Sequence, residues 1–176
     1  FSFLAIPSST ASEQQICSRN CAQRISRAMQ PWQGKLGFEF KRERKHKIKL
    51  GYLSADYRNH PVAHLMSQIF TLHDRECFHV SAYSIGPNDG TGMRERLQTY
   101  FDEFIDLRNM TDVDAARKIY ADEVDILINL TGYTQHSRSE ILALRPAPLQ
   151  VNYLGYPGTL GADFIDYLIA DQFIIP

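Results

Sequence analysis

The residue types that could do chemistry gather in one stretch, GYLSADYRNHPVAHLM, at residues 51–66. Its polar middle carries Asp56, Asn59 and His60, which can move protons or hold a polar ligand. An imidazole titrates near neutral pH, and a nearby carboxylate can orient it or raise its basicity, so Asp56 and His60 could handle a proton together. The spacing equally allows both side chains only to cap a helix and brace the loop. Both interpretations remain open at the level of sequence.

A metal site is the less favoured use of this stretch. His60 and His64 are separated by three residues, a spacing that occurs in metal sites. However, His60 precedes Pro61 and should occupy the helix N-cap, so the two imidazoles need not share a helix face. Cys17 and Cys21 lie one helical turn apart, but no second Cys or His pair completes a zinc motif. We therefore expect no metal, and we expect both cysteines to be small buried hydrophobic residues.

Two glycine-containing loops, at residues 132–134 and 155–159, could let a ligand approach the main chain closely. Tight turns without a ligand are the alternative interpretation of each. A dinucleotide site would need G-x-G-x-x-G directly after the first strand, where this chain has ADYRNHP, and a P-loop is also missing from the sequence. These motifs therefore disfavour an NAD-dependent or NTP-hydrolysing enzyme.

The elements that must position these loops alternate between strands and helices. Apolar runs predict strands at residues 48–54, 78–85, 104–106, 124–130, 149–154 and 167–170. Helical spacing predicts helices at 61–72, at 93–100, after Thr111, and after a capping box of Ser137 and Glu140. Strands separated by helical stretches form βαβ units, so we expect an α/β fold with a doubly wound parallel sheet. One edge of that sheet should then carry the loops at residues 56–60, 86–90, 131–134 and 155–159.

The region before the first strand is predicted to be helical. A helix is expected at residues 12–29, with a weak capping box of Ser12 and Gln15 and with helix breakers at Pro31, Gly34 and Gly37. The basic run KRERKHKIK follows at residues 41–49. It could bind an anion or act as a localisation signal, but a solvated linker is the favoured interpretation.

Length and composition bound the class of protein. The 176 residues suit one α/β domain, with 44% hydrophobic and 22% charged residues as in ordinary globular proteins. A formal net charge of -1 gives no global field for nucleic acid or an anionic membrane. No apolar run approaches the roughly 20 residues of a transmembrane helix, and the opening FSFLAIP lacks the basic region of a signal peptide. Three cysteines indicate a reducing compartment, and a first residue other than Met suggests a piece of a longer polypeptide.

Five segments in their chain order carry a resemblance to a known family: GYLSADYRNHPVAHLM, YSIGPNDGTGMR, ILINLTGYT, ALRPAPLQVNYLGYPGTLG and DYLIADQFIIP. Residues 47–176 resemble the catalytic region of O-linked N-acetylglucosamine transferases and their SPINDLY-like relatives. That family is cytoplasmic and nuclear, with tetratricopeptide repeats ahead of a GT-B glycosyltransferase made of two Rossmann-like lobes. The resemblance implies that residues 1–45 form a helical linker that would follow such repeats. Residues 46–176 would form the N-terminal Rossmann-like lobe, without the second lobe.

The resemblance assigns catalytic roles to His60 and Asp56, which match the DxxNHP loop of the family. It assigns substrate contacts to Asn59, His64, Leu154, Gly155 and Pro157, which match the same loop, the HLM motif and the LGYPG loop. Val62 replaces a threonine of the family, so any hydrogen bond from that hydroxyl is lost. The missing second lobe supplies most nucleotide-sugar contacts in the family, including a lysine for the diphosphate.

The implied function is the acceptor-side half of a protein O-glycosyltransferase. The reaction would be an inverting, metal-independent transfer of N-acetylglucosamine from UDP-N-acetylglucosamine to Ser or Thr hydroxyls. Expected partners are protein acceptors and the nucleotide sugar, with no cofactor, no metal, no nucleic acid and no membrane, in the cytoplasm. Two alternatives remain: a non-catalytic protein-binding module, and an O-fucosyltransferase that uses GDP-fucose. The isolated chain is expected to fold, to bind the nucleotide sugar weakly and to transfer nothing detectable.

Overall fold

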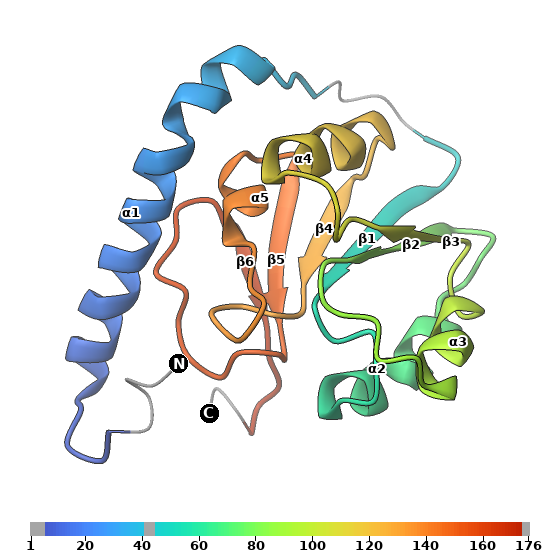
Figure 1. Ribbon diagram of the computed structural model, residues 1–176, viewed down its shortest axis with the longest axis horizontal. Coiled ribbons are helices and arrows are strands. Elements are labelled where there is room, and N and C mark those ends of the chain that lie inside the picture. The colour runs from blue at the N-terminus through green and yellow to red at the C-terminus, as the bar shows by residue number, and fades with distance from the viewer. Residues whose placement is uncertain (1–5, 41–44, 174–176) are drawn as a thin grey trace.

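The structure is a computed structural model that describes residues 6–40 and 45–173. Within these residues six strands form one sheet: β1 (Ile48–Ser54), β2 (Phe78–Ser84), β3 (Glu103–Asp106), β4 (Ile126–Asn129), β5 (Leu149–Tyr153) and β6 (Tyr167–Ile169). The helices of the same residues are α1 (Ala11–Leu36), α2 (Pro61–Leu72), α3 (Gly92–Gln98), α4 (Asp112–Ala121) and α5 (Ser139–Ala143). The element order follows the prediction closely (Figure 1).

All neighbouring strands are parallel, in the order β3-β2-β1-β4-β5-β6, which confirms the predicted α/β parallel sheet. The chain runs outward from β1 to β3 and then returns to β4, which pairs with the other side of β1. The order therefore reverses between β1 and β4. In open parallel sheets, ligands bind beyond the carboxyl ends of the strands at such a reversal. The loops after β1 and β4 occupy that place here.

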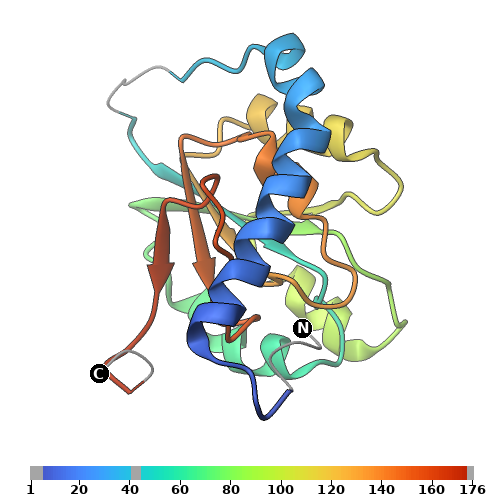
Figure 2. The ribbon, with the colours of Figure 1, turned by 90° about the vertical axis from the view of Figure 1, so that its left-hand side faces the viewer.

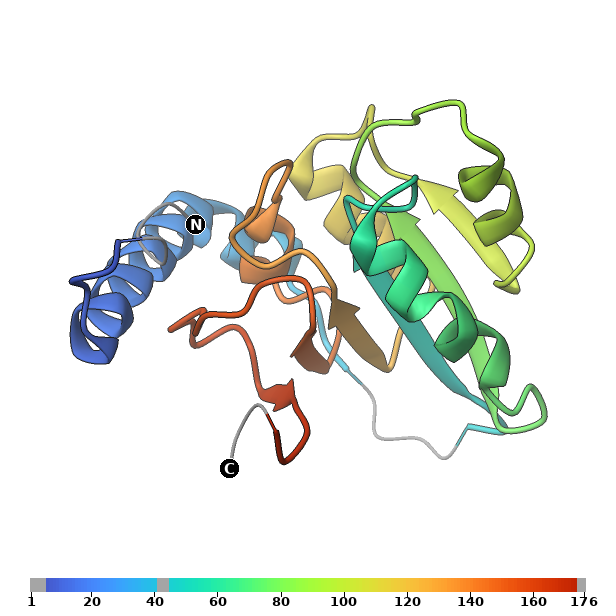
Figure 3. The ribbon, with the colours of Figure 1, turned by 90° about the horizontal axis from the view of Figure 1, so that it is seen from below.

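Helices cover both faces of the sheet, as the term doubly wound requires (Figure 3). Leu50 and Tyr52 of β1 pack with Met66 of α2 in one buried cluster. Leu53 of the same strand packs in a second cluster, which includes Ile25 of α1 and residues of α4 and α5. Because successive strand side chains point to opposite faces, an apolar strand such as β1 can supply both clusters.

Helix α1 is longer than the sequence predicted. It begins after Thr10, whose side chain and that of Glu13 form the capping box, so the predicted box of Ser12 and Gln15 is wrong. The helix passes through Pro31 and ends at Gly37, which has a φ of 56°. Packing of α1 on the lobe outweighs the hydrogen bond that a proline removes. Figure 2 shows α1 running along the segment that follows β5.

Two further expectations are wrong. Cys17 is exposed and Cys21 only half-buried, because the buried stripe of α1 runs through Ser18, Ala22 and Ile25, one position away. Helix α5 has Arg138 at its N-cap without a side-chain capping bond, so the capping box predicted for it does not form. The Oγ atom of Ser137 lies 2.9 Å from the Oγ atom of Ser139 instead.

Two lysines in the described part of the basic run form partly exposed ion pairs. Residues 41–44 lie outside the described residues. The Nζ atom of Lys45 lies 2.8 Å from Oδ1 of Asp125, and that of Lys49 lies 3.5 Å from Oε2 of Glu123. Along residues 6–40 and 45–173, the helices are all too short or too polar to cross a membrane.

Candidate functional site

The turns after β1, β2, β4 and β5 touch one another at the carboxyl edge of the sheet. A Cβ atom on Gly155 would lie 1.6 Å from the Leu130 carbonyl oxygen, and one on Gly86 would lie 1.9 Å from the Ala55 carbonyl oxygen. The Ala55 N–H donates to Oγ1 of Thr131 at 2.9 Å. Only glycine allows the two close approaches, because any side chain would overlap with backbone atoms. The expected convergence of these loops is therefore confirmed.

His60 is a helix cap and also lies close to Asp56, so the capping interpretation is confirmed, while the handling of a proton by the pair stays a prediction. Its Nδ1 atom accepts a hydrogen bond from the Val62 N–H at 3.3 Å at the start of α2. Its Nε2 atom lies 3.6 Å from Oδ1 of Asp56. Because Nδ1 accepts, the proton of the neutral ring belongs on Nε2. His60 thus presents a hydrogen-bond donor at the edge of the sheet.

Arg58 is a member of this cluster that sequence reasoning missed. Its guanidinium lies 3.2 Å from the same Oδ1 atom of Asp56 that faces His60. The Asp56 side chain is only 6% exposed, whereas those of Arg58 and His60 are 24% and 31% exposed. A buried carboxylate needs such partners, because an isolated buried charge is costly. The signal in the sequence is a basic residue two positions after the carboxylate.

Asn59 and His64 are also brought together. The Oδ1 atom of Asn59 lies 2.9 Å from Nε2 of His64, and both residues are exposed. The Asn59 N–H donates to Oδ2 of Asp89 at 2.8 Å. The loop after β1 therefore contacts both the first turn of α2 and the loop after β2.

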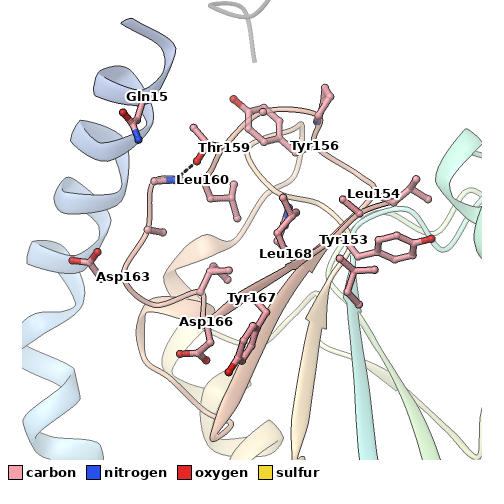
Figure 4. A pocket seen from close by; sticks show the side chains of 18 of the residues that line it. Gln15, Tyr153, Leu154, Tyr156, Thr159, Leu160, Asp163, Asp166, Tyr167 and Leu168 are labelled. Atoms are coloured by element: carbon pink, nitrogen blue, oxygen red, sulfur yellow. Dashed lines mark hydrogen bonds between the residues drawn. The ribbon is translucent and has the colours of Figure 1, made fainter. Parts of the chain in front are cut away.

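The turn after β5 places Leu154, Gly155 and Pro157 at this edge. Leu154 has a φ of 65°, and the Gly155 N–H donates to the Tyr153 carbonyl at 2.8 Å. A cavity of about 830 Å³ lies between this turn, β6 and α1. In Figure 4, Leu154 lies at the end of the cavity away from α1. His60 and Asp56 do not line this cavity, so the structure separates it from the His60 cluster.

Two of the loop glycines make room for an aromatic ring rather than for a ligand. A Cβ atom on Gly132 would lie 2.2 Å from the Cβ atom of Tyr156, and one on Gly158 would lie 2.9 Å from its ring. The Tyr156 ring is buried against Tyr133, at a centroid distance of 5.7 Å. Burial raises the pKa of the Tyr156 hydroxyl. For these two glycines, the interpretation as tight turns fits the packing.

Metal-binding side chains do not cluster in the described part of the chain, where no group of three His, Cys, Asp or Glu residues could hold an ion. The His60 cluster contains one carboxylate, one guanidinium and one imidazole. Such a set can donate and accept hydrogen bonds and carries charges of both signs. These groups could hydrogen-bond the oxygen atoms of a polar ligand.

The family model described as glycosyl transferase family 41 matches residues 3–176 of this chain. The chain belongs to glycosyl transferase family 41. This membership confirms the resemblance to O-linked N-acetylglucosamine transferases that the loop motifs carry.

Two curated relatives of this family-41 chain are similar to it in sequence, and one solved structure is similar to it in fold. The chain is 44% identical over 147 residues to the probable UDP-N-acetylglucosamine–peptide N-acetylglucosaminyltransferase SEC of Arabidopsis thaliana, covering 83% of this chain and 15% of that protein. It is 47% identical over 131 residues to the UDP-N-acetylglucosamine–peptide N-acetylglucosaminyltransferase of Caenorhabditis elegans, covering 74% of this chain and 11% of that protein. A solved structure of a mutant Thermobaculum terrenum O-GlcNAc transferase superposes with a TM-score of 0.86 at 26% identity, covering 99% of this chain and 33% of that chain. The chain thus spans a small part of its family-41 relatives.

Proposed function

We propose that this chain forms the acceptor-side half of a protein O-glycosyltransferase, which transfers N-acetylglucosamine from UDP-N-acetylglucosamine to Ser or Thr hydroxyls. The observation that carries the proposal is the His60 cluster, in which an imidazole faces a buried carboxylate at 3.6 Å. The start of this loop is hydrogen-bonded to Thr131, and the Gly155 turn packs on the main chain next to Thr131. The relatives named for this transfer support the donor and the acceptor class. The proposal concerns the natural full-length protein, of which this chain supplies one lobe.

The transfer is a single displacement at the anomeric carbon of the sugar. The acceptor oxygen forms a bond to that carbon from the face opposite the diphosphate. The bond to the diphosphate oxygen breaks with its electron pair left on the diphosphate, and the hydroxyl proton passes to a diphosphate oxygen or to water. Configuration is therefore inverted. The barrier falls when the reacting atoms are held in line and the charge on the departing diphosphate is stabilised.

His60 serves this reaction as a hydrogen-bond donor. Its Nδ1 atom is held by the Val62 N–H, so its Nε2–H is the group left for a sugar or acceptor oxygen. Asp56 lies near Nε2 at 3.6 Å, which is beyond hydrogen-bond distance, so it adds a negative charge beside the ring while the Nε2–H stays available. Arg58 sets a positive charge beside Asp56. The sugar and the acceptor are then surrounded by five further residues, namely Asn59, His64, Leu154, Gly155 and Pro157. We propose no metal and no cofactor, and a cytoplasmic place for the reaction.

The test is mass spectrometry of acceptor proteins incubated with the full natural polypeptide and UDP-N-acetylglucosamine, with GDP-fucose in a parallel reaction. The expected product carries one N-acetylhexosamine on Ser or Thr. Transfer of fucose alone would replace the proposed donor. Transfer of neither sugar, in protein shown to be folded by circular dichroism, would leave a protein-binding module. This chain alone should fold and transfer nothing detectable.

A further inference from the structure

The loop that carries His60 is held from outside by the segment that follows β2. We call residues 55–60 the His60 loop and residues 86–94 the positioning segment. The Oδ2 atom of Asp89 accepts the Asn59 N–H at 2.8 Å. The Oδ1 atom of Asp89 accepts the Thr91 N–H at 3.2 Å and the Thr91 hydroxyl at 2.9 Å. Asp89 is therefore fixed by its own segment while it binds the main chain of the His60 loop.

Arg94 makes a second attachment and is almost fully buried, at 3% exposure. Its Nη1 atom donates to the Tyr57 carbonyl at 3.0 Å and to Oγ of Ser84 at 3.1 Å. Its Nη2 atom lies 3.4 Å from Oδ2 of Asp106, and its guanidinium lies 5.1 Å from the Phe104 ring. A buried guanidinium is tolerated because it is paired and hydrogen-bonded in this way. Arg94 thus ties the His60 loop to the ends of β2 and β3.

The attachments fall on alternate residues of the His60 loop. The positioning segment contacts the main chain of Ala55, Tyr57 and Asn59. The side chains of the residues between them form the cluster, in which Arg58 and His60 both lie close to Asp56. The loop between these attachments is bent, with the Arg58 N–H donating to the Asp56 carbonyl at 2.8 Å. Fixing the main chain at the three attached residues therefore limits the directions in which the side chains between them can point.

We propose that the positioning segment sets the geometry of the His60 cluster, with Asp89 and Arg94 as positioning residues for sugar transfer. The inference rests on the proposed function for its catalytic consequence. Neither residue touches the reacting atoms. Both act through the main chain of the His60 loop, and their substitution therefore lowers turnover more than it weakens substrate binding.

The deciding variant is Asp89→Ala in the full natural polypeptide, because Asp89 is exposed and its loss leaves the core intact. We expect kcat to fall by about tenfold or more while KM changes by less than about threefold. Asp89→Asn keeps one oxygen that can accept the Asn59 N–H but loses the acceptor for Thr91, so its turnover should lie between that of the unsubstituted protein and that of Asp89→Ala. Asp74→Ala is the matched control, because Asp74 accepts the Glu76 N–H in a similar turn at the opposite edge of the sheet and should leave kcat unchanged.

A double-mutant cycle separates positioning from general destabilisation. In a His60→Ala background, Asp89→Ala has no imidazole left to position and should lower kcat by less than about twofold. Arg94→Lys is a second test of the same proposal. Lysine lacks the forked guanidinium that reaches Tyr57, Ser84 and Asp106 together, so kcat should fall more than substrate binding weakens. An equal loss of kcat from Asp89→Ala with and without His60 would overturn the proposal.

Crystal structures of the full natural polypeptide and of its Asp89→Ala variant give a readout that does not depend on activity. We expect the distance from His60 Nε2 to Asp56 Oδ1 to grow beyond 4.0 Å in the variant, which is the limit for an ion pair. An unchanged His60 loop would overturn the positioning role whether or not the protein transfers sugar. Absence of transfer by the unsubstituted protein would instead count against the proposed function.

Discussion

At the scale of single residues, the role proposed for His60 rests on which of its ring nitrogens already has a hydrogen-bond partner. The Val62 N–H occupies Nδ1, so the neutral ring carries its proton on Nε2. A ring in this form donates a hydrogen bond. It can accept a proton at Nε2 only after losing the one that it holds. Hydrogen bonding to an oxygen of the sugar or the acceptor is therefore the simpler task for His60.

Two substitutions of His60 distinguish a donor from a base. His60→Ala removes the donor, and kcat of the full natural polypeptide should fall about 100-fold or more. His60→Gln retains an N–H donor and should stay within about tenfold of the unsubstituted protein. His79→Ala, at the start of β2, is the control and should keep normal turnover. Equal losses from the two His60 variants would favour a base instead.

The sequence predicted the pair of Asp56 and His60 because the two residues are close along the chain and next to a strand end. It could not predict the contact between Asp89 and Asn59, since these residues are 30 positions apart. Nor did helical spacing predict that Cys17 is exposed, because the register of α1 against the lobe depends on packing.

At the scale of elements, the sequence predicted that the loops meet at one edge of the sheet, but it did not predict where α1 begins and ends. Parallel pairing follows from apolar strands alternating with helical stretches, so the convergence of the loops follows as well. The continuation of α1 through Pro31 depends on tertiary contacts, such as the hydrogen bond from Gln33 to the Ala143 carbonyl at 2.6 Å. Helix-breaking residues such as Pro31 report only on the local sequence, so they do not predict such tertiary contacts.

Among the glycines of the described residues, Gly155 leaves the least space for a side chain. Gly155→Ala should lower the free energy of unfolding by more than about 2 kcal/mol, because the added Cβ atom would overlap with the Leu130 carbonyl. Gly34→Ala is the matched control. Nothing lies within 4 Å of its Cβ position in α1, so stability should rise by up to about 1 kcal/mol. Urea denaturation measures both, and a neutral Gly155→Ala would contradict the close contact between these turns.

At the scale of the whole molecule, carboxylates that accept hydrogen bonds make the free energy of unfolding depend on pH in the acid range. Hydrogen bonds from Arg108 lower the pKa of Asp106 below its ordinary value of 3.8. The Asn59 main-chain N–H likewise lowers the pKa of Asp89. A lowered pKa in the folded state means that the unfolded chain binds protons more readily. The stabilisation is therefore complete above the ordinary pKa and is lost as pH falls through the lowered value.

We expect the free energy of unfolding to be nearly constant from about pH 6 to pH 5 and to fall between about pH 4 and pH 2. Urea denaturation across this range measures the decline. Asp106→Asn should make the decline smaller without removing it, since the amide does not titrate while Asp89 still does. A decline of the same size in that variant would show that other groups cause it.

At the scale of the whole molecule, the two-sided core and the parallel sheet bring the loops after β1, β2, β4 and β5 to one edge. The chain spans 15% of the Arabidopsis SEC protein and 33% of the solved O-GlcNAc transferase chain. The proposed function requires a second side of the cleft outside residues 1–176. The central claim is that the His60 loop and the Gly155 turn line that cleft together.

A crystal structure of the full natural polypeptide with bound UDP-N-acetylglucosamine tests this claim most directly. The account predicts the sugar ring between His60 and the Gly155 turn, with His60 Nε2 within hydrogen-bond distance of a ligand oxygen. A sugar bound at the opposite edge of the sheet, or in the cavity beside α1 without contact to His60, would contradict it.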